Sequence, residues 1–443
     1  MSSRECFDLV GVGLGPANLS LAALAQPIPD FKFGFFERRE TPDWHPGLLF
    51  RESTITVSHL KDLVTLADPT SPYTFLAFLA AKKRLYQFLN AEFPRVSRRE
   101  FNQYLTWVAD RLQGVAFGRA VRSIDLDGEA LEIELDDRAV AARSVVLGTG
   151  IRPRIPTCVA PHLGPQVFHA ASFLYQPNDW RGRQVAVVGG GQTGAEIVFQ
   201  LLGDDRNLPR CIHWTTRRPN FLPLDETPFT NELFTPSYCR HFHGLEPEVR
   251  RALVDEQKLA SDGITSNLLL ALYRRFYELE FIDRRERPFR LYPGWEMTAL
   301  HSGSEGGYAV ALRDRLDGSE ATTLEVDTVV LCTGFEHRLP EALEPLADRI
   351  DGDAAGFRVR ADFSLVWDGP PELRIYIQNA ARHTHGIADS NLSLAAWRSA
   401  TILNSALRRT VYDVAEAASV FDWSRPCAQD SARATLRGVS QAV

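Results

Sequence analysis

The sequence predicts an α/β protein built from two copies of a strand–turn–helix unit, with a mostly helical segment inserted late in the chain. The first copy is the apolar run Cys6–Val10 followed by the turn Gly11–Pro16, and the second is Gln184–Val188 followed by Gly189–Gly194. A third observation is the loss of strand character over residues 225–281. With 443 residues, the chain exceeds the length that one hydrophobic core supports, so two or three domains are expected.

The first copy opens a βαβ unit that is followed by two helices. Ser97 and Glu100 have the spacing of a capping box and mark the start of the second of these helices. The predicted elements of this part are a strand over 6–12, a helix over 16–25, a strand over 31–36, and helices over 71–85 and 98–112.

The rest of the chain alternates strands and helices. Short alternating runs over 120–135 indicate a β-meander, and the second copy returns in the strand 211–216. The other predicted elements are a strand over 145–147, helices over 246–258 and 267–280, and strands from residue 291 to residue 331. The expected domains are residues 1–165 with 335–424, residues 166–224 with 285–334, a helical subdomain over 225–284, and a flexible tail over 425–443.

Composition excludes several classes of function. Hydrophobic residues at 44% and charged residues at 24% are ordinary for a soluble globular protein. The net charge of −7 does not favour nucleic acid or an anionic membrane as a partner, because both attract a basic surface. No apolar stretch reaches the ~20 residues that span a bilayer, and the predicted first strand leaves no room for a signal peptide.

The six cysteines are scattered and include no C-x-x-C pair. Cys6, Cys211 and Cys332 lie in apolar, strand-like runs, so we expect them to be buried free thiols. Free thiols are typical of a reducing, cytoplasmic compartment. The sequence leaves the oligomeric state open, with a homo-oligomer as one possibility.

The first glycine turn predicts a dinucleotide site. A strand that ends in such a turn and reopens as a helix presents unpaired N–H groups and the positive end of a helix dipole to a pyrophosphate. Gly11 and Gly13 fit the G-x-G-x-x-G pattern, whereas Pro16, with Gly15 beside it, takes the place of the third glycine. Glu37 ends the second strand, where an acid can bind a ribose hydroxyl. The alternative is a turn that serves packing alone.

The second turn, with Gly189 and Gly191, differs at the corresponding strand end. Arg217 and Arg218 stand where an acid would be expected. Guanidinium groups pair with a 2′-phosphate, which favours NADPH over NADH, although a solvated basic pair is the alternative. Two dinucleotide sites in one chain suggest a flavin that is reduced by a nicotinamide. The strand ends Leu147–Gly150 and Leu331–Gly334 indicate either chain crossings between two nucleotide domains or simple tight turns.

A set of further motifs resembles the flavin-dependent N-hydroxylating monooxygenases of siderophore biosynthesis. The resemblance extends to about residue 423. It is carried by Asp43–Gly47, Leu60–Val64, Asp68–Tyr73, Gly189–Gly194, Asn231–Pro236, Ser261–Ile264, Asp327–Pro340 and His383–Ser399. It implies FAD bound by the first domain, NADPH bound by the second, and a small, mostly helical substrate-binding insertion. The implied fold is two Rossmann-like dinucleotide-binding domains with that insertion.

The resemblance also implies roles for single residues. Residues of the segment Glu37 to His45 lie along the FAD, and Thr56 stands where the family usually has a flavin-contacting glutamine. The implied FAD-binding residues are Gly11, Gly13, Gly15, Pro16, Glu37, Arg38, Trp44, His45, Thr56, Ser390, Asn391 and Leu392. The implied NADPH-binding residues are Gly189, Gly191, Gln192, Thr193, Arg217, Arg218 and Asn231. The implied substrate-binding residues are Lys61, Asn231, Glu232, Leu233, Phe234 and Ser393.

The implied reaction is the hydroxylation of a terminal side-chain amine by NADPH, FAD and O₂, through a hydroperoxide formed on the reduced flavin. Lys61 matches the family's partner for the substrate α-carboxylate, and the stretch Ser261–Ile264 favours lysine over ornithine. Ornithine, putrescine and cadaverine are the alternative substrates. The flavin carries the chemistry, so no catalytic protein nucleophile is expected.

Other functions have weaker support in the sequence. A disulfide-type flavin reductase would need the missing C-x-x-C pair. His383 and His385 could form a metal pair, but no third ligand follows at a suitable spacing, so no metal is expected. A non-catalytic nucleotide-binding protein is the more distant alternative, and it predicts that NADPH would not bleach a bound flavin.

Overall fold

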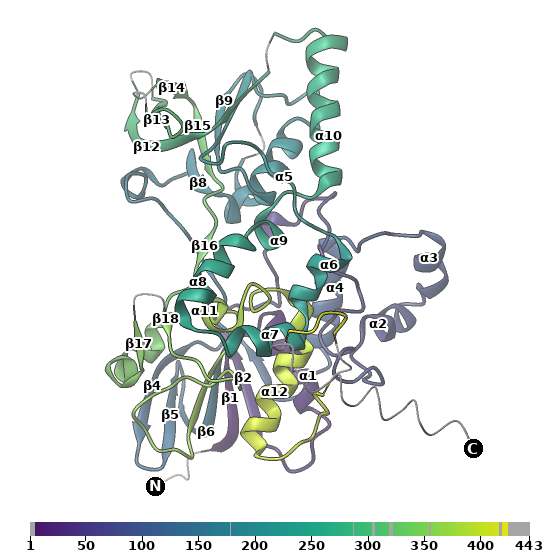
Figure 1. The fold of residues 1–443 in the computed structure, drawn as a ribbon, viewed down its shortest axis with the longest axis vertical. Helices are drawn as coiled ribbons and strands as arrows, with labels where there is room; N and C mark the ends of the chain where they lie inside the picture. Colours follow the sequence, from purple (N-terminus) through teal and green to yellow (C-terminus); the bar gives the residue numbers. More distant parts are fainter. Residues whose placement is uncertain are drawn as a thin grey trace, which may run out of the picture.

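The computed structural model describes residues 5–423 except 178, 287, 304–305, 319–321, 354–355 and 416–418. Two sheets lie at opposite ends of the long axis of the molecule, and most of the helical segment lies between and beside them (Figure 1). The predicted tail over 425–443 lies outside the described residues.

The first sheet has the strand order β3-β2-β1-β6-β5-β4. β1 (Cys6–Val12) pairs in parallel with β2 (Phe33–Glu37) and β6 (Ala139–Leu147). The other edge of β6 is shared, since β5 (Ala130–Leu135) pairs antiparallel with its first half and β19 (Arg374–Ile377) pairs in parallel with its second half. β3 (Val115–Phe117) and β4 (Val121–Asp127) complete this sheet.

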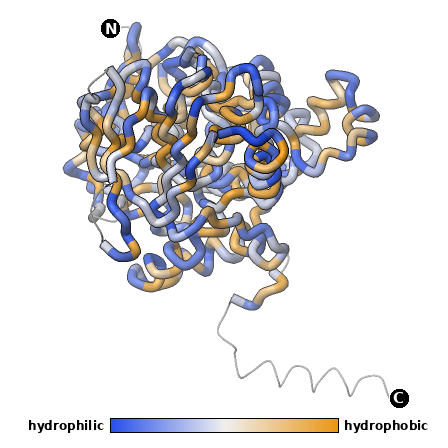
Figure 2. The backbone as a smooth tube through the Cα atoms, turned by 90° about the horizontal axis from the view of Figure 1, so that it is seen from above, coloured by the Kyte–Doolittle hydropathy of each residue, from blue (hydrophilic) through white to orange (hydrophobic). Residues whose placement is uncertain are grey.

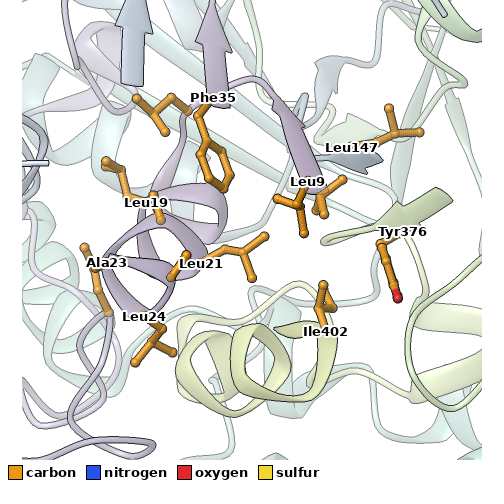
Figure 3. Packing of buried hydrophobic residues seen from close by; sticks show 14 of the residues in the cluster. Leu9, Leu19, Leu21, Ala23, Leu24, Phe35, Leu147, Tyr376 and Ile402 are labelled. Atoms are coloured by element: carbon orange, nitrogen blue, oxygen red, sulfur yellow. The ribbon is translucent and has the colours of Figure 1, made fainter. Parts of the chain in front are cut away.

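Helices cover the first sheet. α1 (Pro16–Ala25) connects β1 to β2 and packs against α12 (Ala395–Leu407). Figure 3 shows Leu21 of α1 and Ile402 of α12 in the space between the helices and the strand residues Leu9 and Tyr376. The remaining elements of this part are α2 (Phe75–Ala81), α3 (Leu85–Asn90), α4 (Arg98–Ala109), α11 (Arg382–His385), and the short helices η1 (Pro46–Leu48), η6 (Glu341–Arg349) and η7 (Leu392–Leu394).

The second sheet is fully parallel, with the order β11-β10-β9-β15-β8. Its strands are β8 (Val167–His169), β9 (Gln184–Val188), β10 (Cys211–Thr216), β11 (Phe289–Pro293) and β15 (Thr328–Leu331). α5 (Gln192–Leu201) follows β9. A separate antiparallel sheet contains β12 (Trp295–Ser302), β13 (Tyr308–Asp314) and β14 (Thr322–Val326). Short elements complete this part: β7 (Arg152–Pro153), η2 (Ala160–His162), η3 (Ala170–Tyr175) and β16 (Phe335–Glu336). β17 (Gly352–Asp353) pairs with β18 (Gly356–Phe357).

The helical segment connects the two sheet units. Its elements are α6 (Pro228–Asn231), η4 (Glu232–Phe234), α7 (Pro236–His243), α8 (Pro247–Glu256), α9 (Leu259–Asp262), α10 (Ser266–Tyr277) and η5 (Glu278–Ile282). α7 and α8 pack against α11 of the first unit, whereas α10 packs against α5 of the second. The predicted α/β class with two Rossmann-like units and a helical insertion is therefore confirmed.

Several local predictions need correction. The helix expected over 71–85 is two helices, because Lys83 adopts a left-handed conformation with φ 57° and breaks the run between α2 and α3. Cys6 is exposed rather than buried, since it lies at the outer end of β1, and Cys332 is only partly buried.

Figure 2 shows apolar residues along the inner chain segments and polar residues along the outer loops. The lobe with α2 and α3 projects from the body.

Candidate active site

The glycines of the first turn have two different tasks. Gly13 has φ 82°, and a Cβ there would lie 2.7 Å from the carbonyl oxygen of Gly148, so this residue allows two chain segments to cross. A Cβ on Gly15, in contrast, would meet no atom within 4 Å. Gly15 precedes Pro16 at the first position of α1. The open space therefore lies at the amino end of a helix, where a phosphate group fits.

A pocket adjoins this turn. Of the predicted FAD-binding residues, Gly15, Pro16, Glu37 and Trp44 line it. The Glu37 carboxylate accepts hydrogen bonds from the backbone N–H groups of Leu14 (2.8 Å) and Arg39 (3.0 Å). Its position is thus fixed, and each oxygen keeps a second lone pair for a ligand hydroxyl. The other lining residues are Leu14, Leu19, Arg39, Thr41, Pro42, Asp43, Leu105 and Phe117.

Two predicted flavin residues fit less well. Arg38 is exposed, and its neighbour Arg39 lines the pocket instead. Sequence reasoning missed Arg39, although a basic residue just after the acidic strand end was visible. Thr56 is also exposed, and no hydrogen bond connects it to the other candidate residues within the described part of the chain.

His45 lies between the two sheet units. It has a left-handed backbone with φ 49°, and its ring contacts Trp44 and Phe335 of β16 at centroid distances of 5.3 and 6.0 Å. Burial, together with the charges of Arg98 and Arg39, lowers the pKa of His45 to about 4. The imidazole is therefore neutral at physiological pH and can contact an uncharged ring system without the cost of burying a charge.

The second turn repeats the division of tasks. A Cβ on Gly189 would lie 2.1 Å from the carbonyl oxygen of Cys332, whereas a Cβ on Gly191 would meet nothing within 4 Å. Gly191 is the residue before α5. Each turn thus has one glycine that permits a chain crossing and one that leaves room beside a helix amino end, which is the geometry that a dinucleotide pyrophosphate needs.

The side chain of Gln192 is occupied within the protein. Its Nε2 donates to Oε1 of Glu196 and its Oε1 accepts from the N–H of Thr265, both at 2.9 Å. Glu196 in turn pairs with Arg98 of α4 at 2.9 Å. Gln192 therefore joins parts of both sheet units and the helical segment. Thr193 lies half-buried in the first turn of α5.

The two arginines that were predicted to select NADPH have different surroundings. Arg217 is exposed at the end of β10. Arg218 is half-buried, and its Nη1 donates to the carbonyl oxygen of Asp262 at 2.9 Å. The structure thus leaves Arg217 better placed than Arg218 to meet an added phosphate group.

Two predicted substrate residues far apart in sequence meet. Lys61 Nζ donates to Oγ of Ser393 at 3.3 Å, and the hydroxyl and N–H of Ser393 both donate to Oδ1 of Asn391 at 2.8 Å. Burial lowers the pKa of Lys61. Asn391 and Leu392 are half-buried beside this contact, whereas Ser390 is exposed. A half-buried cation next to polar groups is suited to an anionic ligand.

The segment from Asn231 to Phe234 lies on the short helices α6 and η4. Phe234 and Leu233 pack with the core of the first sheet unit, and Asn231 is exposed. The Glu232 carboxylate accepts a 2.5 Å hydrogen bond from Ser419 in the last described segment. The structure thus gives Glu232 a partner that the sequence did not predict.

His383 and His385 of the H-x-H motif lie in α11 and make contacts within the protein. No group of three or more His, Cys, Asp or Glu residues with metal-binding geometry occurs in the described part of the chain. His383 Nε2 instead lies 2.6 Å from the carbonyl oxygen of Phe357, and the ring of His385 stacks on Phe363 at 4.2 Å. Among the same residues, no helix has the length and apolar character of a membrane span.

Two Rossmann-like units, each with a glycine turn that leaves space at the amino end of a helix, define a flavoprotein oxidoreductase that uses two dinucleotides. Residues 5–337 match the family model of L-lysine 6-monooxygenase/L-ornithine 5-monooxygenase, and the chain belongs to this family. It is a flavin-dependent N-hydroxylating monooxygenase of the siderophore-biosynthesis class. FAD and NADPH are its cofactors, as the two glycine turns predict and as similar solved structures with bound FAD and NADP⁺ support.

Relatives with different substrates resemble the chain over nearly its whole length. It is 39% identical to the L-lysine N6-monooxygenase of Escherichia coli, with 95% of this chain and 99% of the relative covered. The FAD-bound cadaverine monooxygenase of Erwinia amylovora matches with a TM-score of 0.88 and 30% identity, over 95% of this chain and 99% of that one. The ornithine N-hydroxylase of Kutzneria sp. 744, solved with reduced FAD, NADP⁺ and L-ornithine, matches with a TM-score of 0.84 and 31% identity, over 91% and 99%.

Proposed function

We propose that this enzyme hydroxylates the terminal side-chain amine of L-lysine. The observation that carries the proposal is the contact between Lys61 and Ser393, which lies beside the loop of Asn391 and Leu392. Lys61 supplies a half-buried cation, and the α-carboxylate of an amino acid is its natural partner. The 39% identity to an L-lysine N6-monooxygenase supports lysine over the other amines.

Each part of the chain has a role in this proposal. Residues 1–165 and 335–424 form the FAD-binding domain, residues 166–224 and 285–334 the NADPH-binding domain, and residues 225–284 the substrate-binding subdomain. Gly15 and Glu37 hold the pyrophosphate and a ribose of FAD, and Gly191 and Arg217 hold the pyrophosphate and 2′-phosphate of NADPH. We also propose a cytoplasmic location, because free thiols such as Cys211 are typical of a reducing compartment.

The protein must also deliver a neutral amine. The ammonium group of a lysine side chain in water has a pKa of about 10.4, so it is charged at neutral pH. The site must lower this pKa by excluding water, because only the neutral amine can accept an oxygen atom. Bound FAD, once reduced by NADPH, supplies the activation of O₂. Phe234 and Leu392 are the apolar residues that we propose to exclude water, while Ser393 orients the substrate. Dry surroundings also limit the unproductive release of H₂O₂.

The test measures NADPH oxidation together with hydroxylamine formation for L-lysine, L-ornithine, putrescine and cadaverine. We expect the highest kcat/KM for L-lysine, with nearly one hydroxylamine formed for each NADPH oxidised. A preference for ornithine would contradict lysine as the substrate, but it would leave the role of Lys61 intact because ornithine also has an α-carboxylate. A preference for a diamine would contradict the role of Lys61, because a diamine offers no carboxylate. Light scattering on the same preparation tests whether the enzyme forms a homo-oligomer.

A further inference from the structure

A buried chain of polar side chains connects the first glycine turn to the loop at residues 389–393. It begins at the carbonyl oxygen of Gly13, which accepts a 2.7 Å hydrogen bond from Nδ2 of Asn18. Oδ1 of Asn18 accepts from Nε2 of Gln378 at 2.7 Å, and Oε1 of Gln378 accepts from Nε of Arg398 at 3.1 Å. Asn18, Gln378 and Arg398 are 0%, 2% and 1% exposed. Asn18, Gln378 and Arg398 are not among the candidate ligand residues, although Gly13 at the start of the chain is.

Arg398 of α12 is the centre of this chain. Its Nη1 donates to the backbone carbonyl of Asp389 and, at 3.1 Å, to Oδ1 of the same residue. Its Nη2 donates to Oδ1 of Asn379 at 2.7 Å. The Asp389 side chain is completely buried, and its other oxygen accepts from the N–H of Ala381 at 2.7 Å. A planar guanidinium with acceptors on two chain segments, residues 378–379 and residue 389, fixes these segments relative to each other and to α12.

The loop that starts at Asp389 bears four of the candidate ligand residues, Ser390 to Ser393. Asn391 lies two residues further on, and its side chain holds Ser393 through two hydrogen bonds of 2.8 Å. Ser393 contacts Lys61. Because backbone joins Asp389 directly to these residues, a shift of Asp389 changes the position of Asn391 and Ser393.

We propose that Arg398 is a positioning residue for the N-hydroxylation, which holds the loop at residues 389–393 at a fixed place relative to the first glycine turn. This proposal rests on the proposed function for the nature of the two ligands. Its consequence is that the substrate beside Ser393 and the flavin beside the first turn share one rigid frame. Since reacting atoms must be aligned closely, a displacement of about 1 Å can lower a rate on the order of a hundredfold.

The main test is Arg398→Lys, which keeps the charge but lacks the planar set of donors that reaches the acceptors on both segments. The matched control is Arg408→Lys directly after the same helix, because Arg408 is exposed and donates to the carbonyl oxygen of Glu372 at the surface. Hydrogen exchange of the peptide over 389–393 is measured without ligands, and KM for lysine and product formed per NADPH are measured in the FAD-loaded enzyme.

We expect Arg398→Lys to speed exchange of the loop and to raise KM for lysine about tenfold or more, with flavin reduction by NADPH within about threefold of wild type. Arg408→Lys should match the wild type in all three measurements. Faster exchange without a change in KM or coupling would mean a merely structural role and would overturn the proposal. Unchanged exchange would overturn it as well.

A second variant keeps the test decisive if Arg398→Lys does not fold. Gln378→Glu still accepts a hydrogen bond from Arg398 but can no longer donate to Asn18, so it interrupts the chain at one point. We expect the same direction of change, and a Gln378→Glu enzyme with wild-type exchange and KM would contradict the proposal. If the wild type hydroxylates none of the four amines, the proposed function fails. The positioning role fails separately, when the wild type is active and Arg398→Lys leaves either the loop exchange, or both KM and coupling, unchanged.

Discussion

Arg98 at the start of α4 and Glu196 on α5 form an ion pair between the two Rossmann-like units, with 2.9 Å between Nη1 and Oε2. The Glu196 side chain is 6% exposed and that of Arg98 is 18% exposed, so water screens this pair only weakly. Glu196 also accepts from Gln192, which connects the pair to the helical segment through Thr265. This polar cluster near the second glycine turn is therefore one of the contacts that place the two units, together with the packing of Leu48 and Phe50 against the core of the second unit.

The first prediction concerns that ion pair. Arg98→Met should lower the melting temperature, because it leaves the buried Glu196 carboxylate without its charge partner. Arg98→Met combined with Glu196→Gln should recover part of the loss, with a coupling of about 0.5–3 kcal/mol. Thermal unfolding of the wild type, both single variants and the double variant measures this coupling. Strictly additive changes in melting temperature would show that the pair contributes no coupling.

The second prediction assigns a different cofactor to each glycine turn, FAD to the first and NADPH to the second. Gly15→Val and Gly191→Val place a side chain in open space, so each should block a ligand rather than disturb the fold. Gly15→Val should purify without flavin colour, whereas Gly191→Val should stay yellow and be reduced only slowly by NADPH. Absorbance at the flavin bands before and after anaerobic NADPH addition measures both outcomes. Two yellow variants that reduce at the wild-type rate would refute the assignment of the turns.

Gly13→Val makes an instructive comparison. Its side chain would meet the backbone of Gly148, and its φ of 82° disfavours a β-branched residue. Loss of flavin in this variant would therefore reflect damage to the fold, and circular dichroism should show that damage.

The third prediction assigns NADPH selectivity to Arg217. Arg217→Ala should raise KM for NADPH about tenfold and leave KM for NADH nearly unchanged, because only NADPH presents a 2′-phosphate. Arg218→Ala serves as the neighbouring comparison, since the Arg218 guanidinium is already bonded to Asp262. Equal increases of KM for both nucleotides in Arg217→Ala would rule out the assignment.

The fourth prediction tests the role of Lys61. Lys61→Ala should weaken lysine binding by about 2–5 kcal/mol, because it removes a charged partner of the carboxylate. Flavin reduction by NADPH should remain intact. The gap in kcat/KM between lysine and cadaverine should narrow, since only lysine loses a contact. If the ratio of kcat/KM between lysine and cadaverine stays constant in steady-state assays, Lys61 does not bind the carboxylate.

The fifth prediction is a pH dependence of stability. Burial, together with the charges of Arg290 and Arg210, lowers the pKa of His213 to about 4. Between pH 6.5 and 4 the unfolded chain then binds more protons at this residue than the folded protein, so stability falls as the pH falls through that range. His213→Gln should lose less melting temperature than the wild type between pH 7 and 4.5. His301→Gln, at an exposed position, should follow the wild type.

Local patterns predicted much of the fold. The bounds of β1 and α1 agree with the sequence prediction, because an apolar run, a glycine turn and Pro16 mark them without ambiguity. Ser97 accepts from the N–H of Glu100 at the start of α4, as its position indicated. The break at Lys83 escaped detection, since a left-handed lysine has no sequence signal.

The candidate site was harder to predict from residues alone. Lys61 and Ser393 are separated by most of the chain, so only the family resemblance connected them before the structure showed their contact. The different tasks of Gly13 and Gly15 depend on where Gly148 lies, which is a tertiary relationship. Gln192 fitted a ligand role by position, yet its side chain bonds Glu196 and Thr265 because the helical segment folds back onto α5.

The shared edge of β6 has a consequence for the order in which the protein is made. β19 pairs with β6, but the whole second sheet lies between them in the chain. At about 5–20 residues per second, synthesis from Leu147 to Arg374 takes on the order of 10–45 s, and during that interval half of the β6 edge has no partner. The second sheet unit can fold on the ribosome first, and the first unit closes only when its last strand emerges.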